Sequence, residues 1–144
     1  MKTASILLLT ILLITSVPAA CFAIEVADAV MCLDVQDRQP VEPGESFTVD
    51  VGKVWCWSKI KDGQGTTISH VYYHDGEEKA VINLAIRSPL FRTYSSKRIL
   101  PSWTGPWRVD IVAADGNVLK SLDFTIGEKA APEEESGPEE ESEP

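Results

Sequence analysis

Apolar and polar residues alternate in short runs along most of this chain. In the run VWCW, for example, Val54 and Cys56 lie on one face, and the two Trp residues lie on the other. A period of two residues is typical of a β-strand with one buried face. Because no run sustains the 3.6-residue period of an amphipathic helix, the folded part is predicted to consist of strands.

Turn sequences rich in Gly, Pro, Asp and Asn separate seven such runs. Strands are predicted over residues 26–35, 51–60, 66–74, 79–87, 91–99, 107–113 and 118–126. The sequence RQPVEPGES, between the first two, is predicted to be a turn region. Strands of this length and spacing indicate an all-β domain, an immunoglobulin-like antiparallel β-sandwich of about seven strands, rather than a barrel.

Residues 1–23 have the features of a secretory signal peptide. Lys2 precedes the apolar run ILLLTILLIT, and small residues follow up to Ala23. Cleavage after Ala23, or after Ala19 or Ala20, is expected to export the rest of the chain to the periplasm or the extracellular space. Attachment to a membrane is expected only if the signal segment is retained or Cys21 is lipidated.

Acidic residues are concentrated at the C-terminus. The chain has a formal net charge of -9, and residues 128–144 contain eight Glu and one Lys. This segment, EKAAPEEESGPEEESEP, has no aromatic or β-branched residue to bury and is predicted to be a disordered acidic tail. The predicted domain, residues 24–127, has 11 Lys and Arg against 14 Asp and Glu. Export and net acidity both argue against nucleic acid as a partner.

Two cysteines, Cys32 and Cys56, remain after the predicted cleavage. An even pair in a small exported domain is predicted to form a disulfide, which would stabilise the fold by roughly 3 kcal/mol. Two thiols are too few for a structural zinc site. His70 and His74, four residues apart on a predicted strand, are about 13 Å apart, too far to share an ion. We therefore predict no metal and no cofactor, with His70 as a buried or interface hydrogen-bonding residue and His74 solvated at a turn.

Residues 92–107, RTYSSKRILPSWTGPW, are basic and aromatic, and no acid occurs between Glu78 and Asp110. Guanidinium groups bind carboxylates and phosphates, and Trp rings stack on sugars or cations. The candidate binding surface comprises Arg87, Arg92, Ser95, Ser96, Lys97, Arg98, Trp103 and Trp107. Its expected ligand is an anionic glycan or an acidic protein segment, and the acidic tail could cover it. The alternative is that Arg side chains pack over Trp rings and join two sheets.

Four runs carry a family resemblance: VQDRQPVEPGESF, VWCWSKIKDGQGTTISHVYYHDG, RSPLFRTYSSKRI and WTGPWRVDIVAADGNVL. In this order the chain resembles, over residues 27–126, the bacterial family called domain of unknown function 2914. The blocks RTYSSK and WTGPWRV are the most specific. The resemblance implies an exported or membrane-tethered protein, as the family's members typically are. It also implies a compact β domain. It gives no catalytic residue that could be assigned in this chain.

No catalytic arrangement is evident in the sequence. A Ser-x-x-Lys motif ending at Lys97 would need Ser at position 94, where Tyr94 stands. Ser96 and Lys97 are adjacent on a predicted strand and therefore face opposite sides. We predict a non-enzymatic binding or interaction module of the bacterial envelope. The alternative is a carbohydrate-recognition module for an acidic glycan.

Overall fold

The computed structural model describes residues 22–127, so most of the predicted signal peptide and all of the predicted acidic tail lie outside the described residues. Within this range the chain forms strands and no helix, and so no helix long and apolar enough to cross a membrane. The strands are β1 (Glu25–Gln36), β2 (Gln39–Pro43), β3 (Ser46–Thr48), β4 (Lys53–Lys61), β5 (Thr67–His74), β6 (Glu77–Ala85), β7 (Leu90–Arg98), β8 (Gly105–Val112) and β9 (Val118–Gly127).

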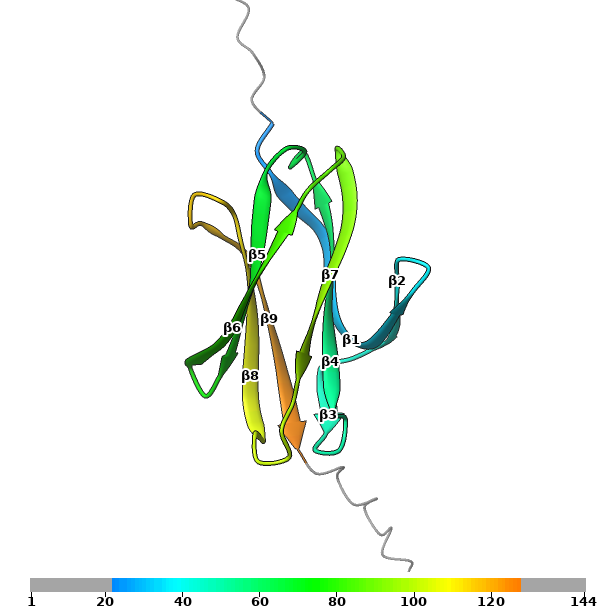
Figure 1. Ribbon diagram of the computed structural model, residues 1–144, viewed down its shortest axis with the longest axis vertical. Helices are drawn as coiled ribbons and strands as arrows, with labels where there is room; N and C mark the ends of the chain where they lie inside the picture. Colours follow the sequence, from blue (N-terminus) through cyan, green and yellow to red (C-terminus); the bar gives the residue numbers. More distant parts are fainter. Residues whose placement is uncertain (1–21, 128–144) are drawn as a thin grey trace, which may run out of the picture.

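Two sheets pack face to face as a β-sandwich (Figure 1). One sheet has the strand order β2-β1-β4-β7, and the other has the order β3-β9-β8-β5-β6. The predicted all-β sandwich is therefore confirmed, whereas its immunoglobulin-like type stays a prediction. One pair departs from the predicted antiparallel arrangement, because β3 runs parallel to β9.

The sequence did not predict two strands: β2, which lies within the expected turn region, and β3, which begins at the last residue of that region. Asp37 and Arg38 have positive φ values of 49° and 61°, which allow a two-residue hairpin turn between β1 and β2. Pro43 lies on an edge strand, where the missing backbone donor is tolerated. The chain then crosses to the other sheet, where the carbonyl of Glu45 accepts a hydrogen bond from Thr125 N at 2.9 Å. Strand β2 was not predicted because its prolines are more typical of turns than of strands.

Inward-facing apolar side chains form two clusters, one toward each end of the sandwich. The cluster at the end where β4 begins contains Val54 and Cys56, which confirms the face predicted for them. The other cluster contains Ile60, Ile68, Ile86, Ile111 and Ala29. Burial of these side chains stabilises the fold by about 1.5–3 kcal/mol for each large aliphatic residue.

The structure corrects the predicted disulfide, because Cys32 and Cys56 are both buried free thiols. In the β1–β4 register Cys32 lies opposite Trp55, and Cys56 lies opposite Met31. Neighbouring positions on paired strands point to opposite faces of a sheet. The Cys56 thiol therefore points into the core, whereas the Cys32 thiol lies on the other side, 3.8 Å from the Trp55 carbonyl oxygen.

Candidate functional site

The residues of the predicted binding surface do not form one surface. Strand β7 places alternate side chains on opposite faces of its sheet. Arg92, Ser96 and Arg98 are on the outer face, where both Arg side chains are exposed. Ser95 points inward and is buried. Arg87 is exposed in the segment that joins β6 to β7.

Trp107 is a core residue that is only 2% exposed. Its ring stacks on Phe124 with the centroids 5.8 Å apart, and on His74 with the centroids 4.7 Å apart. Its Nε1 donates to the Trp103 carbonyl at 3.0 Å. His74 was expected to be solvated, and this is wrong, because its side chain is 11% exposed and its Nε2 donates to the Thr104 carbonyl at 2.7 Å. Trp107 is therefore a core residue rather than a sugar platform, and its ring packs on Phe124 and His74 instead of under the Arg side chains of the structural alternative.

The six cations between Glu78 and Asp110 separate into two groups of three. Lys79 Nζ and Lys97 Nζ lie 5.3 and 5.1 Å from the ring centroid of the half-buried Trp103. The guanidinium carbon of Arg108 lies 4.4 Å from the ring centroid of Tyr73. These three cations already pack on aromatic rings of the fold. The exposed group is Arg87, Arg92 and Arg98.

On the outer face of the four-stranded sheet, the side chains of β7 lie beside those of β4. The register forms outward-facing rows across the two strands, in order Lys53 with Arg98, Trp55 with Ser96, Trp57 with Tyr94, Lys59 with Arg92, and finally Lys61 with Leu90. We define the β4–β7 outer face as Lys53, Trp55, Lys59, Arg92, Tyr94, Ser96 and Arg98. It contains one row of two cations toward each end and aromatic rings between them.

Trp55 and Tyr94 form the aromatic centre of this face. Their ring centroids are 5.9 Å apart in an edge-to-face arrangement. Tyr94 is 41% exposed, Trp55 is half-buried, and Lys53 Nζ lies 5.1 Å from the Trp55 ring centroid. Trp57 is only 3% exposed, and its Nε1 donates to the carbonyl of Arg38 in the β1–β2 turn at 2.9 Å. Two rings on this face therefore remain accessible to a ligand.

The four cations of the outer face have no ion-pair partner in the described residues, although the charge of Lys53, after the hydrogen bonds from Gln36 and Val35, contributes to lowering the pKa of Asp34 on β1. Within residues 22–127, the only ion pairs join other side chains, and none involves Lys53, Lys59, Arg92 or Arg98. Asp28 lies opposite Lys59 in the β1–β4 register and is exposed without pairing to it. An unpaired guanidinium can present its fork of N–H donors to a carboxylate, sulfate or phosphate group. The face is therefore suited to an anion.

Sequence reasoning identified Arg92, Ser96 and Arg98, but it missed the residues that β4 contributes. A signal was present, because Lys53, Trp55 and Lys59 occupy alternate positions of one run. Alternation shows that these side chains share a face. It does not show that this strand pairs with residues about 40 positions further along the chain, which only the fold decides.

A buried polar network joins the two sheets between the two apolar clusters. The hydroxyl oxygen of Ser95 lies 2.7 Å from His70 Nδ1 and 2.7 Å from the Tyr72 hydroxyl oxygen. His70 Nε2 lies 3.2 Å from Ser58 Oγ. Burial lowers the pKa of His70 to about 4 and raises the pKa of Tyr72, so both are neutral at pH 7. The buried, hydrogen-bonded role predicted for His70 is confirmed, and these side chains satisfy one another rather than face solvent.

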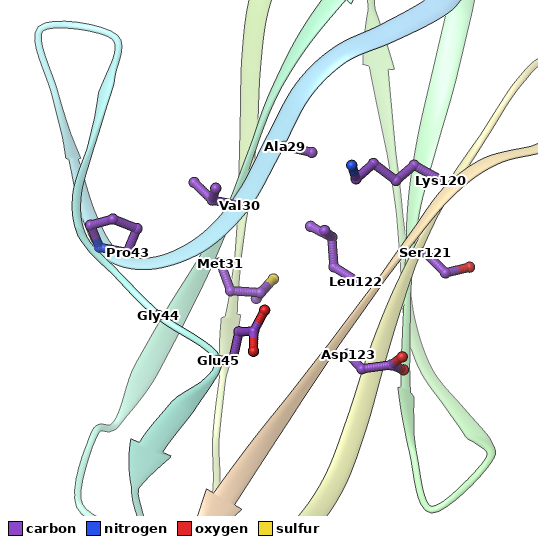
Figure 2. A pocket seen from close by; sticks show the side chains of 10 residues that line it. All are labelled: Ala29, Val30, Met31, Pro43, Gly44, Glu45, Lys120, Ser121, Leu122 and Asp123. Carbon is purple, nitrogen blue, oxygen red and sulfur yellow. The ribbon is translucent and has the colours of Figure 1, made fainter.

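A groove of about 700 Å³ lies between β1 and β9 on another side of the sandwich (Figure 2). Met31 and Leu122 contribute apolar surface to it. Its polar lining carries both signs of charge, from Lys120, Glu45 and Asp123. β2 pairs with only one half of β1, and β3 with only the end of β9, so the strand edges along the groove have no partner strand in residues 22–127. The mixed charge gives this groove no preference for anions, unlike the β4–β7 outer face.

Comparison with known proteins identifies a family and no activity. The model of the family described as Protein of unknown function (DUF2914) matches residues 65–126. This segment contains β7, whereas β4 precedes it. No curated protein matches the chain. The resemblance carried by the blocks RTYSSK and WTGPWRV is thereby confirmed over residues 65–126, the part of the chain that matches the model of the DUF2914 family of proteins of unknown function.

Proposed function

We propose that this chain is a non-enzymatic binding module that is exported to the bacterial envelope and binds an anionic ligand on the β4–β7 outer face. The observation that supports this proposal is the presence of four cations without ion-pair partners around two accessible aromatic rings. Exposed cations without partners contribute little to stability. Their concentration on one sheet face is what a site for an anionic ligand requires.

The spacing of the cations favours an extended polymer over a small ion. The row of Lys53 and Arg98 lies six residues from the row of Lys59 and Arg92 along both strands. Six residues of a strand span about 20 Å. A single phosphate or carboxylate reaches only one row, whereas a linear chain of acidic groups reaches both. The Trp55 and Tyr94 rings lie between the two rows, where their apolar faces can stack on the sugar rings of such a polymer.

A linear acidic glycan is therefore the favoured ligand, and an acidic protein segment is the second candidate. The test is calorimetric titration of oligogalacturonate, a linear polymer of uronic acids, into the protein at 50 mM and 500 mM NaCl. We expect binding at the lower salt concentration, and a loss of at least tenfold in affinity when Arg92 and Arg98 are both replaced by Gln. Neutral maltohexaose should bind much more weakly if the cations select the ligand.

Arg87→Gln is the matched control, because Arg87 is equally exposed and belongs to the same basic stretch but lies outside the face. It should retain wild-type affinity. The proposal is wrong if oligogalacturonate does not bind, or if Arg87→Gln weakens binding as much as the double variant does. A circular dichroism spectrum of each variant establishes that the sandwich is retained.

A further inference from the structure

We propose that the acidic C-terminal segment of this same chain, residues 133–141, binds the β4–β7 outer face and competes with the external anionic ligand. This inference rests on the proposed function, because both occupants use the same surface. It names the regulation of that surface and follows from three properties of the chain: the place where the described residues end, the length that follows, and the spacing of opposite charges.

The described chain ends close to one end of the outer face. Strand β9 finishes at Gly127, which lies opposite Thr48 in the parallel β3–β9 pair. The short segment that joins β3 to β4 is held by two backbone hydrogen bonds, which Val51 N donates to the Thr48 carbonyl and Lys53 N donates to the Val51 carbonyl. Figure 1 shows that β9 ends, β4 begins and β7 ends at the same end of the sandwich. The row of Lys53 and Arg98 is therefore the first part of the face that the following segment meets.

The segment is long enough to reach both rows. Glu134 lies seven positions after Gly127, and an extended chain over seven positions spans up to about 25 Å. The complete 17 residues that follow Gly127 span up to about 60 Å. The outer face along nine-residue β7 is about 30 Å long. Chain length thus permits contact along the entire face.

The charges of the segment and of the face have the same spacing. Glutamates occur as two triplets, residues 133–135 and 139–141, whose centres are six residues apart. The cation rows of the face are also six residues apart, because Arg92 and Arg98, like Lys53 and Lys59, are separated by six positions. In extended conformation both intervals are about 20 Å. One triplet can therefore lie over each row, with opposite signs of charge throughout.

Covalent attachment makes weak contacts sufficient. Exposed ion pairs are individually weak and are screened over about 8 Å at physiological salt. A short flexible connection keeps the segment near its site at an effective concentration in the millimolar range. An external ligand must exceed this local concentration to displace the segment. The predicted consequence is that the domain selects long or densely charged polyanions over short ones.

Paramagnetic relaxation enhancement tests this contact without any external ligand. A nitroxide is attached to the variant Ser136→Cys of the predicted mature chain, residues 24–144; Ser136 lies between the two Glu triplets. The native thiols of Cys32 and Cys56 are buried and should not react in the folded protein. At 20 mM NaCl we expect broadening of amide signals from β4 and β7, and its loss at 500 mM NaCl.

The matched control carries the same label and has all six glutamates of the two triplets replaced by Gln. The contact is refuted if the label broadens no β4 or β7 signal at low salt, or if the Gln variant broadens the same signals equally. Reversal of charge on the face, by Arg92→Glu with Arg98→Glu, should also abolish the broadening.

Titration with oligogalacturonate separates this inference from the proposed function. We expect the Gln variant to bind the oligomer at least threefold more tightly than the wild-type chain at 50 mM NaCl. Equal affinities would overturn competition and leave the proposed function intact. Broadening of the β4 and β7 signals together with no oligomer binding by either chain would support the intramolecular contact and overturn the proposed external ligand.

Discussion

Protonation of His70 is expected to make the stability of this protein fall between pH 7.5 and pH 5. Burial disfavours the charged imidazolium and lowers the pKa of His70 from 6.5 to about 4. Its neighbours do not compensate the charge, because burial raises the pKa of both Tyr72 and Cys56, which stay neutral in this range. An imidazolium at this position would face hydroxyl groups and no carboxylate.

The sign of the effect follows from proton uptake. Above pH 7.5 the His70 side chain is neutral in both the folded and the unfolded state. As the pH falls below 6.5, the unfolded chain takes up a proton that the folded protein does not, so unfolding becomes more favourable. The loss between pH 7.5 and pH 5 is about 2 kcal/mol, and it approaches about 3 kcal/mol as the pH nears 4. Most exposed carboxylates remain ionised above pH 5, so this window isolates the histidines.

Urea unfolding followed by tryptophan fluorescence at four pH values between 7.5 and 5 measures this loss. The chain has two histidines, so His74→Gln serves as the control that keeps His70 in place, and its free energy of unfolding should still fall as the pH is lowered. His70→Gln keeps a hydrogen-bonding side chain without the titration, and its free energy of unfolding should change little over the same range. A wild-type slope in His70→Gln, or a flat profile in the wild-type protein, would refute the argument.

Four further outcomes are expected from the core packing and from the β4–β7 outer face. Ser95→Ala removes the hydrogen bonds that its hydroxyl makes with His70 Nδ1 and with the Tyr72 hydroxyl, and should lower the free energy of unfolding by about 2–4 kcal/mol. Trp107→Ala should destabilise the fold by about 3–5 kcal/mol in the same urea titration. Trp55→Ala should lower the free energy of unfolding by less than Trp107→Ala does, but it should weaken oligogalacturonate binding. A larger loss of stability in Trp55→Ala than in Trp107→Ala would contradict the assignment of the outer face. Because Cys32 and Cys56 are buried free thiols, a thiol reagent should label neither in the folded mature chain and both after unfolding, whereas a disulfide would leave none to label.

The alternation of apolar and polar residues was enough to predict which residues form most of the strands and which side chains face inward. Val54 and Cys56 are in the core as predicted, because alternation along a strand is a local property that neighbouring residues impose. The burial of His70 was also predictable, since it occupies an inward position between apolar residues of β5. In contrast, β2 and β3 exist only through hydrogen bonds to β1 and β9, which no local pattern specifies.

The candidate site was only half determined by the sequence. Arg92 and Arg98 were recognised as exposed cations of a basic stretch, but Trp107 of the same stretch is buried against Phe124. Strand β4 pairs with β7 only in the folded structure, and this pairing adds Lys53 and Trp55 to the face. Side-chain alternation is a local property that can be read from neighbouring residues. Strand pairing joins residues far apart in the sequence and depends on how the whole core is buried. The basic, aromatic composition of residues 92–107 therefore led to the hypothesis of an anion-binding surface, whereas the positions of these residues relative to one another depend on the fold.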